Sequence, residues 1–194
     1  MNTLFPIYVK MDQIQTLLVG AGPIGLEKIQ AILNNSPEAK VKVVAEVISE
    51  EFLAFVAALP LVTVHQKSFE PSDLEKVDLV VVASNNATLN EWIRELASAN
   101  HILLNVADKP SLCDFYLGSV VQKGDLKIGI STNGKSPTIA KRVKELLNDL
   151  IPEEIDETLA LMQQLRNNLK GDFQEKIKVL NAHTKELVTN DSGN

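Results

Sequence analysis

The glycine-rich turn Gly20-Ala21-Gly22-Pro23-Ile24-Gly25 constrains the fold of this chain more than any other segment. It follows directly on the apolar run Gln15–Val19, which has strand character, and it opens an amphipathic segment that ends near Leu33. Glycines at these spacings permit a tight turn, close approach of the backbone to a phosphate, and close packing of a helix on a sheet. The helix N-terminus would present free N–H groups to that phosphate. The strand–turn–helix order therefore predicts a βαβ unit that binds the pyrophosphate of a dinucleotide.

Residues 15 to 105 alternate short apolar runs with longer amphipathic segments. The pattern predicts strands at Gln15–Val19, Val41–Ala45, Leu61–His65, Leu79–Ala83 and Ile102–Asn105, and helices at Pro23–Leu33, Ser49–Ala58 and Ala87–Ala99. Such alternation is typical of an α/β fold, a Rossmann-type parallel sheet with right-handed crossovers and helices on both faces. Phe5–Lys10 is a candidate edge strand or hairpin partner before the first strand.

The pattern changes after Asp108. Phe115–Gln122 and Leu126–Ser131 predict a β-hairpin, and Ser136-Pro137 predicts the start of a helix that ends near Leu150. Pro152 interrupts the helical pattern, and two further helices are predicted at Glu153–Leu169 and Phe173–Val188. The second half of the chain therefore combines a hairpin with a small helical carboxyl-terminal domain.

Composition excludes several classes of protein. Net charge is −6 and aromatic residues make up 5% of the 194 residues, which argues against a nucleic-acid partner. No apolar run reaches the roughly 18 residues needed to cross a bilayer, and no secretory signal is visible at the N-terminus. The single cysteine, Cys113, cannot form an internal disulfide and has no evident cationic neighbour to activate it. We expect a cytoplasmic protein with a structural thiol.

Polar residues after the predicted strands are candidate cofactor contacts. Glu46 lies 21 residues after Gly25, where an acidic side chain can accept hydrogen bonds from ribose hydroxyls and repel a 2′-phosphate. This spacing favours NAD over NADP, although a solvated loop carboxylate is the alternative interpretation. Val47, Ser84 and Asn85 are expected beside the cofactor. Ser84-Asn85-Asn86 is equally suited to cap the next helix, and both roles can hold at once.

Five motifs occur in a fixed order along the chain. They are Phe5-Pro6-Ile7-Tyr8, the Gly20–Gly25 turn, Asn105-Val106-Ala107-Asp108, Leu112-Cys113-Asp114-Phe115 and Ser131-Thr132-Asn133-Gly134-Lys135-Ser136-Pro137. As an ordered set they resemble the precorrin-2 dehydrogenase family, which includes the amino-terminal part of siroheme synthases. The resemblance extends from about residue 4 to about residue 152. Ala45-Glu46 departs from it, because the family often has Ala-Pro there.

The resemblance implies NAD-dependent oxidation of precorrin-2 to sirohydrochlorin by a homodimer. It further implies a Rossmann domain over residues 1–113, a dimerisation and substrate-binding segment over 114–150, and a helical domain over 151–194. Some family members also insert Fe²⁺, so a dehydrogenase that is also a ferrochelatase is a second hypothesis. A non-catalytic NAD-binding module that senses redox state is a third.

Asp108 corresponds in position to the key aspartate of the family. The resemblance makes it the candidate general base, or the group that orients the macrocycle for proton loss. The local sequence Asp108-Lys109-Pro110 is also typical of a turn or helix-capping aspartate.

The substrate is a polyanion, so its site needs hydrogen-bond donors and positive charge. We expect Thr132, Asn133, Gly134, Lys135 and Ser136 to grip its carboxylates through backbone N–H groups and side chains. Lys135 is the candidate charge contact, whereas Lys141, Arg142 and Lys144 are expected to complement a helix dipole or to be solvated. His65, His101 and His183 lie far apart in sequence, so no metal site is predicted.

Overall fold

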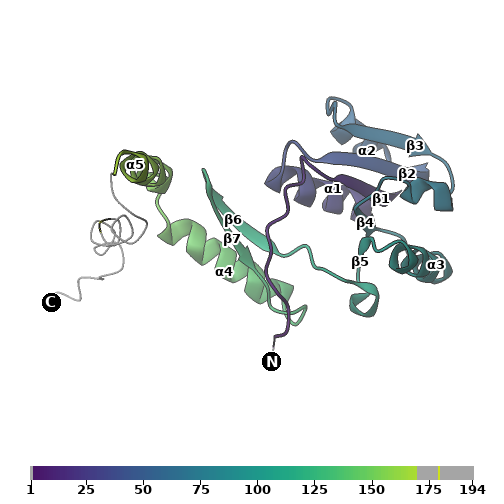
Figure 1. Ribbon diagram of the computed structural model, residues 1–194. Helices are drawn as coiled ribbons and strands as arrows, with labels where there is room; N and C mark the ends of the chain where they lie inside the picture. The colour runs from purple at the N-terminus through teal and green to yellow at the C-terminus, as the bar shows by residue number, and fades with distance from the viewer. Residues whose placement is uncertain (1, 170–178, 180–194) are drawn as a thin grey trace. The chain divides into compact units, whose positions relative to one another are not determined.

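The five-stranded sheet of this chain is parallel throughout. A computed structural model describes residues 2–169 and Val179. It contains the strands β1 (Gln15–Ala21), β2 (Lys40–Ile48), β3 (Val62–Gln66), β4 (Leu79–Val82) and β5 (Leu103–Val106), in the order β3-β2-β1-β4-β5 (Figure 1). The chain runs outward from β1 to β3 and then returns to β4 on the other side of β1. The carboxyl ends of β1 and β4 therefore flank the point where doubly wound sheets bind ligands.

Helices cover both faces of the sheet, as the alternating pattern predicts. Successive side chains of a strand point to opposite faces. Leu17 of β1 packs in one core with Ile93 of α3 (Ala87–Ala99). Its neighbour Leu18 packs in the other core with Ile29 of α1 (Pro23–Asn35) and Phe52 of α2 (Glu50–Val56). All five side chains are fully buried, so the predicted Rossmann-type fold is confirmed with two aliphatic cores.

The predicted boundaries agree closely with the structure, and α3 matches residue for residue. The prediction of a strand at Phe5–Lys10 is wrong, since this segment forms no ladder and Phe5 is 85% exposed. The physical reason is that β1 has no free edge, because β2 and β4 occupy both of its sides. The opening segment therefore had no place beside the strand that follows it.

A second compact unit comprises residues 120–130 together with the described residues from Lys141 onward. It contains most of the hairpin β6 (Ser119–Lys123) and β7 (Leu126–Ile130), most of α4 (Pro137–Leu150), and α5 (Ile155–Asn168). Strand β6 begins four residues later than Phe115, the predicted start. The predicted helix Phe173–Val188 lies outside the described residues except for Val179. The predicted domain limits at residues 113 and 150 stay a prediction.

The first turn of α5 holds the tip of the hairpin within this unit. Lys123 forms an ion pair with Glu153, and the Asp125 N–H donates to Asp156 Oδ1 at 2.7 Å. Gly124, between them, has φ +53°, and a Cβ there would lie 2.0 Å from Asp156 Cγ. The hairpin turn thus needs a glycine both for its backbone conformation and for the approach of α5.

We expect Leu18→Ala to lower the free energy of unfolding by about 2–5 kcal/mol, because it leaves a cavity between β1 and α1. Leu53→Ala makes the same chemical change on α2, at a side chain that is 48% exposed, and should cost less than about 0.5 kcal/mol. Urea unfolding of both variants measures the difference. Equal losses would contradict the assignment of Leu18 to the core.

Candidate functional site

The glycine turn is shaped by two close backbone approaches. Gly20 has φ +103°, and a Cβ on it would lie 2.4 Å from the carbonyl oxygen of Ala83, just after β4. A Cβ on Gly25 would lie 2.2 Å from the Gly20 carbonyl oxygen. Any larger residue at either position would therefore push α1 away from the sheet. By contrast, a Cβ on Gly22 would meet nothing within 4 Å, so open space lies in front of the start of α1.

That open space is a fit for a phosphate. Gly22 is the N-cap of α1 and Pro23 occupies its first turn, so the first N–H groups of a 13-residue helix have no intrahelical partner. No acidic side chain lies in that first turn to neutralise the helix dipole. The backbone around Gly22 can therefore approach an anion closely, which is the requirement for binding the pyrophosphate of a dinucleotide.

A cavity of about 260 Å³ lies over the carboxyl ends of the strands. It is lined by Val19, Gly20, Ala21, Gly22, Val44, Ala45, Glu46, Val47, Lys67, Phe69, Ala83, Ser84, Asn86 and Leu89. Of the expected cofactor contacts, Gly20, Ala21, Gly22, Glu46, Val47 and Ser84 are in this lining. Pro23, Ile24, Gly25 and Asn85 are not. Gly25 instead acts on the cavity indirectly, through the packing of α1 on Gly20.

Sequence reasoning missed the contribution of the segment after β3. Lys67 and Phe69 line the cavity, although neither belongs to a recognisable motif. The signal was present in the topology, because β3 pairs with β2 and places its carboxyl end beside Glu46. Residues that follow a neighbouring parallel strand are expected at the same sheet edge.

Glu46 stands at an irregularity of β2. Val19 of β1 pairs with Val44, but Ala21 pairs with Ile48, so β2 has two extra residues over the interval that contains Glu46. The Glu46 side chain is exposed at the cavity, and the hydroxyl of Ser68 donates to its Oε1 at 2.6 Å. The irregularity thus turns a carboxylate toward the cavity from the end of a strand that is otherwise paired on both sides.

Ser84 and Asn86 have different roles in the loop after β4. Asn86 caps α3, since its Oδ1 accepts from the Leu89 N–H at 3.1 Å. The hydroxyl of Ser84 accepts from the Asn86 N–H at 3.0 Å, and its carbonyl accepts from Asn90 Nδ2 at 3.0 Å. Helix capping and proximity to the cavity therefore coexist in this loop.

Asp108 lies two residues beyond β5, with an exposed side chain and φ +57°. Aspartate tolerates this left-handed conformation better than most residues. The turn is held by hydrogen bonds from the Ala107 N–H to the Val82 carbonyl at 2.9 Å and from the Lys109 N–H to the Val106 carbonyl at 3.2 Å. Asp108 is therefore a turn aspartate at the ligand-binding edge of the sheet. It is not in the lining of the cavity described above.

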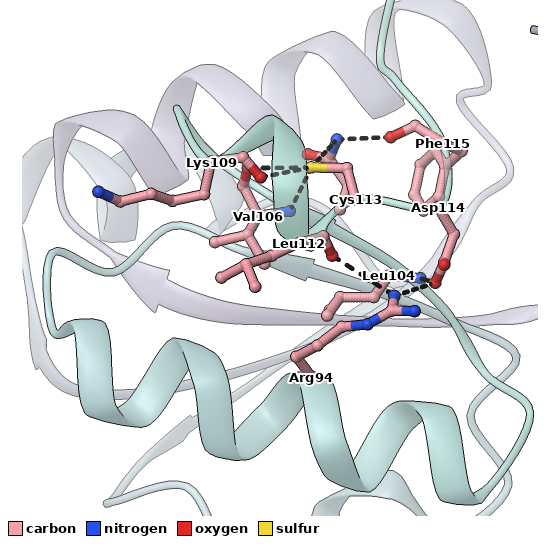
Figure 2. A network of polar contacts seen from close by, with 9 residues as sticks. Arg94, Leu104, Val106, Lys109, Leu112, Cys113, Asp114 and Phe115 are labelled. Carbon is pink, nitrogen blue, oxygen red and sulfur yellow. Dashed lines mark hydrogen bonds and ion pairs between the residues drawn. The ribbon is translucent and has the colours of Figure 1, made fainter.

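Side chains from three places fix the loop that carries Asp108 (Figure 2). Asp114 Oδ2 accepts from Arg94 Nη1 at 2.6 Å and from the Leu104 N–H at 3.0 Å. Asn105, which is buried, donates from Nδ2 to the Phe115 carbonyl at 2.8 Å. This last bond explains why the predicted strand does not begin at Phe115, since its carbonyl is satisfied by a side chain instead of a sheet ladder.

Cys113 belongs to the same network. Its Sγ accepts from the Val106 N–H at 3.2 Å and lies 3.3 Å from the carbonyl oxygens of Val106 and Lys109, to which the thiol can donate (Figure 2). Burial raises the pKa of the Cys113 thiol above its ordinary value. The thiol therefore stays protonated at neutral pH, and its place in the network is structural, as expected from the sequence.

The predicted substrate segment, residues 132–136, forms a closed turn. Thr132 Oγ1 accepts from the Ser136 N–H at 3.2 Å and lies 3.1 Å from the Ser136 carbonyl oxygen. The hydroxyl of Ser136 accepts from the Ile139 N–H at 3.1 Å, which makes Ser136 the cap of α4. Asn133 and Gly134 have φ +55° and +73°, and the Lys135 side chain is exposed. None of the five residues lines the cavity beneath Glu46.

Within the described part of the chain, no group of three or more His, Cys, Asp or Glu side chains is arranged to hold a metal ion. His65 and His101 are exposed there, and His183 lies outside the described residues. No helix among these residues is long and apolar enough to cross a membrane.

The fold and the glycine turn define a dinucleotide-binding α/β protein. Residues 7–119 match the model of a family described as NAD(P)-binding, and residues 123–150 match a model described as sirohaem biosynthesis protein central. Because the first match covers more than half of the chain, this protein belongs to that NAD(P)-binding family.

Two siroheme synthases support the resemblance predicted from the motifs. The siroheme synthase of Vesicomyosocius okutanii subsp. Calyptogena okutanii (strain HA) is 32% identical over 179 residues, which cover 89% of this chain and 36% of that protein. The siroheme synthase of Baumannia cicadellinicola subsp. Homalodisca coagulata is 32% identical over 165 residues, which cover 85% and 35%. The chain thus spans about a third of the length of these curated relatives. The resemblance to the amino-terminal part of siroheme synthases is confirmed.

A solved structure has the same fold along nearly the whole chain. The structure named SirC, precorrin-2 dehydrogenase, superposes with a TM-score of 0.75 and covers 96% of this chain and 90% of that chain, at 24% identity. The likeness therefore includes the hairpin and the helical region as well as the parallel sheet.

We expect Asp114→Ala to lower the free energy of unfolding by about 1–3 kcal/mol, because the buried Leu104 N–H loses its acceptor. Arg94→Ala should cost less than about 1 kcal/mol, since its ion pair with Asp114 is partly exposed. Asp114→Asn keeps one oxygen acceptor and should fall between the two. Urea unfolding measures all three, and an Arg94 loss as large as the Asp114 loss would refute this order.

Proposed function

We propose that this chain oxidises precorrin-2 to sirohydrochlorin with NAD as the hydride acceptor. One observation carries the proposal: the glycine turn and the exposed carboxylate of Glu46 line the same cavity, at the edge of the sheet where doubly wound folds bind ligands. The fold that forms this cavity is shared with a precorrin-2 dehydrogenase over 96% of the chain. Siroheme synthases, which match at 32% identity, are named for the same tetrapyrrole chemistry. A cytoplasmic location is part of the proposal, because a lone thiol suits a reducing compartment.

The preference for NAD is supported by Glu46. Its exposed carboxylate lies at the cavity near the end of β2, where it can accept from both hydroxyls of the adenosine ribose. A 2′-phosphate at the same place would meet a like charge, which disfavours NADP.

Asp108 is the proposed catalytic residue. NAD bound at the glycine turn would accept a hydride from the macrocycle, and a proton must leave the macrocycle as well. Asp108 lies on an exposed turn at the ligand-binding edge, and Cys113 fixes the backbone on both sides of it through the Val106 N–H and the Lys109 carbonyl oxygen. Its exposed carboxylate is available to accept that proton.

The turn from Thr132 to Ser136 is the proposed grip on substrate carboxylates. The exposed Lys135 offers a positive charge, and the left-handed residues Asn133 and Gly134 shape the backbone that leads to it. Ser136 is engaged as a helix cap, and the N–H groups of Asn133, Lys135 and Ser136 are bonded within the turn, so the Lys135 ammonium supplies the main contact.

A homodimer is proposed from the apolar face of α4. Ile139, Leu146 and Leu150 are 58%, 63% and 70% exposed, and their spacings of seven and four residues place them on one side of a helix. The hairpin β6–β7 forms a sheet of only two strands among the described residues, and such a pair is marginally stable alone. A second copy of the chain would cover both features.

Anaerobic assays with precorrin-2 and NAD test the proposal directly. We expect sirohydrochlorin absorbance to appear with the unaltered chain, and Asp108→Asn to lower kcat by about 10²-fold or more while the Kd for NAD is unchanged.

Lys135→Glu should raise KM for the tetrapyrrole without changing NAD affinity. The absence of any oxidation would leave a redox-sensing module, and uptake of Fe²⁺ added after oxidation would reveal a chelatase.

Light scattering tests the dimer. We expect a mass of twice 21.3 kDa for the unaltered chain. Leu146→Glu together with Leu150→Glu should give the monomer mass, because charges would be buried at the contact. Leu53→Glu is the matched control on α2 and should leave the dimer intact. A monomer at every concentration would refute this part of the proposal.

A further inference from the structure

The lining of the cavity contains one cationic and one anionic side chain. Among the described residues that line it, Lys67 is the only basic side chain and Glu46 the only acidic one. Glu46 lies near the end of β2 and Lys67 directly follows the neighbouring strand β3, and the Lys67 N–H donates to the Ala45 carbonyl at 3.0 Å. A lysine at the edge where the adenosine ribose is expected would ordinarily attract a 2′-phosphate.

The charge of Lys67 is occupied by two carboxylates. Its Nζ lies 2.9 Å from Asp73 Oδ2 and 3.3 Å from Glu70 Oε2. Asp73 is only 3% exposed, and its Oδ1 lies 2.8 Å from Lys42 Nζ. The two lysines and two carboxylates cancel in formal charge, so Glu46 leaves this edge of the cavity negative.

The protonation of this cluster follows from its contacts. Burial acts to raise the pKa of Asp73, but hydrogen bonds from Lys42, from Lys67 and from the Glu70 N–H outweigh it and hold the pKa below its ordinary value. The hydrogen bond to Asp73 raises the pKa of Lys67. Both groups therefore stay charged at neutral pH, and Lys67 stays paired.

Ser68 contacts Glu46, the acidic residue of the cavity lining. Its hydroxyl donates to Glu46 Oε1 at 2.6 Å, although both residues are exposed. Gln66 Nε2 also donates to the Glu46 carbonyl, at 3.3 Å. The Gln66 bond holds the backbone of Glu46, and the Ser68 bond holds a carboxylate that would otherwise be free to rotate in solvent. Oε2 is left available to accept from a ligand hydroxyl.

We infer that Ser68 and Lys67 set the dinucleotide preference of this site. Ser68 holds the Glu46 carboxylate as an acceptor for a free 2′-hydroxyl, while Asp73 and Glu70 keep the Lys67 ammonium from binding a 2′-phosphate. The site thus rejects NADP through a positioned carboxylate and a neutralised lysine, and the lysine becomes available to a 2′-phosphate only when one of its own carboxylate partners is removed. This inference rests on the NAD binding proposed above.

Calorimetric binding of NAD⁺ and NADP⁺ to the full chain tests the role of Ser68. We expect Ser68→Ala to weaken NAD⁺ binding severalfold, up to about tenfold, and Ser68→Thr to restore it, because a hydrogen bond to a charged group is lost and then replaced. In a Glu46→Gln background the same Ser68→Ala change should have a smaller effect. Equal effects in both backgrounds would mean that Ser68 does not act through Glu46 and would overturn its role.

Binding of NADP⁺ to variants of the full chain tests the role of Lys67. Glu46→Ser should tighten NADP⁺ binding by about tenfold, because a like charge is removed. Glu70→Gln in the Glu46→Ser background should tighten NADP⁺ binding severalfold further, since one partner of Lys67 is lost. Adding Lys67→Met should abolish this further gain, whereas adding Lys40→Met, which removes the same charge at the opposite end of β2, should preserve it.

The outcomes separate this inference from the proposed function. If the unaltered chain binds neither dinucleotide, the proposed NAD-dependent reaction fails. If NAD⁺ binds but the further NADP⁺ gain of Glu70→Gln survives Lys67→Met, the role of Lys67 is overturned while the proposed reaction stands. Circular dichroism of each variant shows whether it is folded, and the substituted side chains of Glu46, Ser68 and Glu70 are exposed enough for a folded product.

Discussion

The backbone contact between the glycine turn and the end of β4 determines how the rest of the site is arranged. Gly20 approaches the Ala83 carbonyl and Gly25 approaches Gly20, at separations that leave no room for a Cβ. These approaches bring the N-terminus of α1 close to the sheet, where its free N–H groups face the open space at Gly22. A phosphate site of this kind uses main-chain groups, so its accuracy depends on packing and not on side-chain chemistry.

The opposite side of the ligand-binding edge is organised by side chains. Asp108 lies on an irregular turn, and irregular backbone must find hydrogen-bond partners outside a ladder. Asp114, Asn105 and Cys113 supply them by binding the main chain of β5 and of the loop itself (Figure 2). The Leu112–Phe115 motif therefore serves the position of Asp108, which explains physically why the two motifs occur close together in the chain.

Charge at the ribose edge is balanced by residues from different strands. Glu46 lies near the end of β2, Lys67 follows β3, and Asp73 lies on the short 3₁₀ helix Pro71–Leu74. A buried carboxylate paired with two lysines is stable only because every partner is in place, since an unpaired charge there would be costly. The selectivity inferred for the site thus depends on a charge cluster of which Lys67 lines the cavity and Lys42, Glu70 and Asp73 do not.

The amino-acid sequence by itself determined the order of strands and helices, because apolar runs such as Leu79–Val82 and the glycine spacing follow local rules of burial and backbone conformation. It also indicated Glu46 and Asp108, since their positions after strands define the sheet edge on which they lie. It misplaced Phe5–Lys10 and the start of β6, where the lack of a free edge beside β1 and a side-chain donor from elsewhere decide the outcome. Only the tertiary structure brought Ser68 to Glu46 and paired Lys67 with Asp73 at the same cavity, because strand order joins residues that no spacing rule connects.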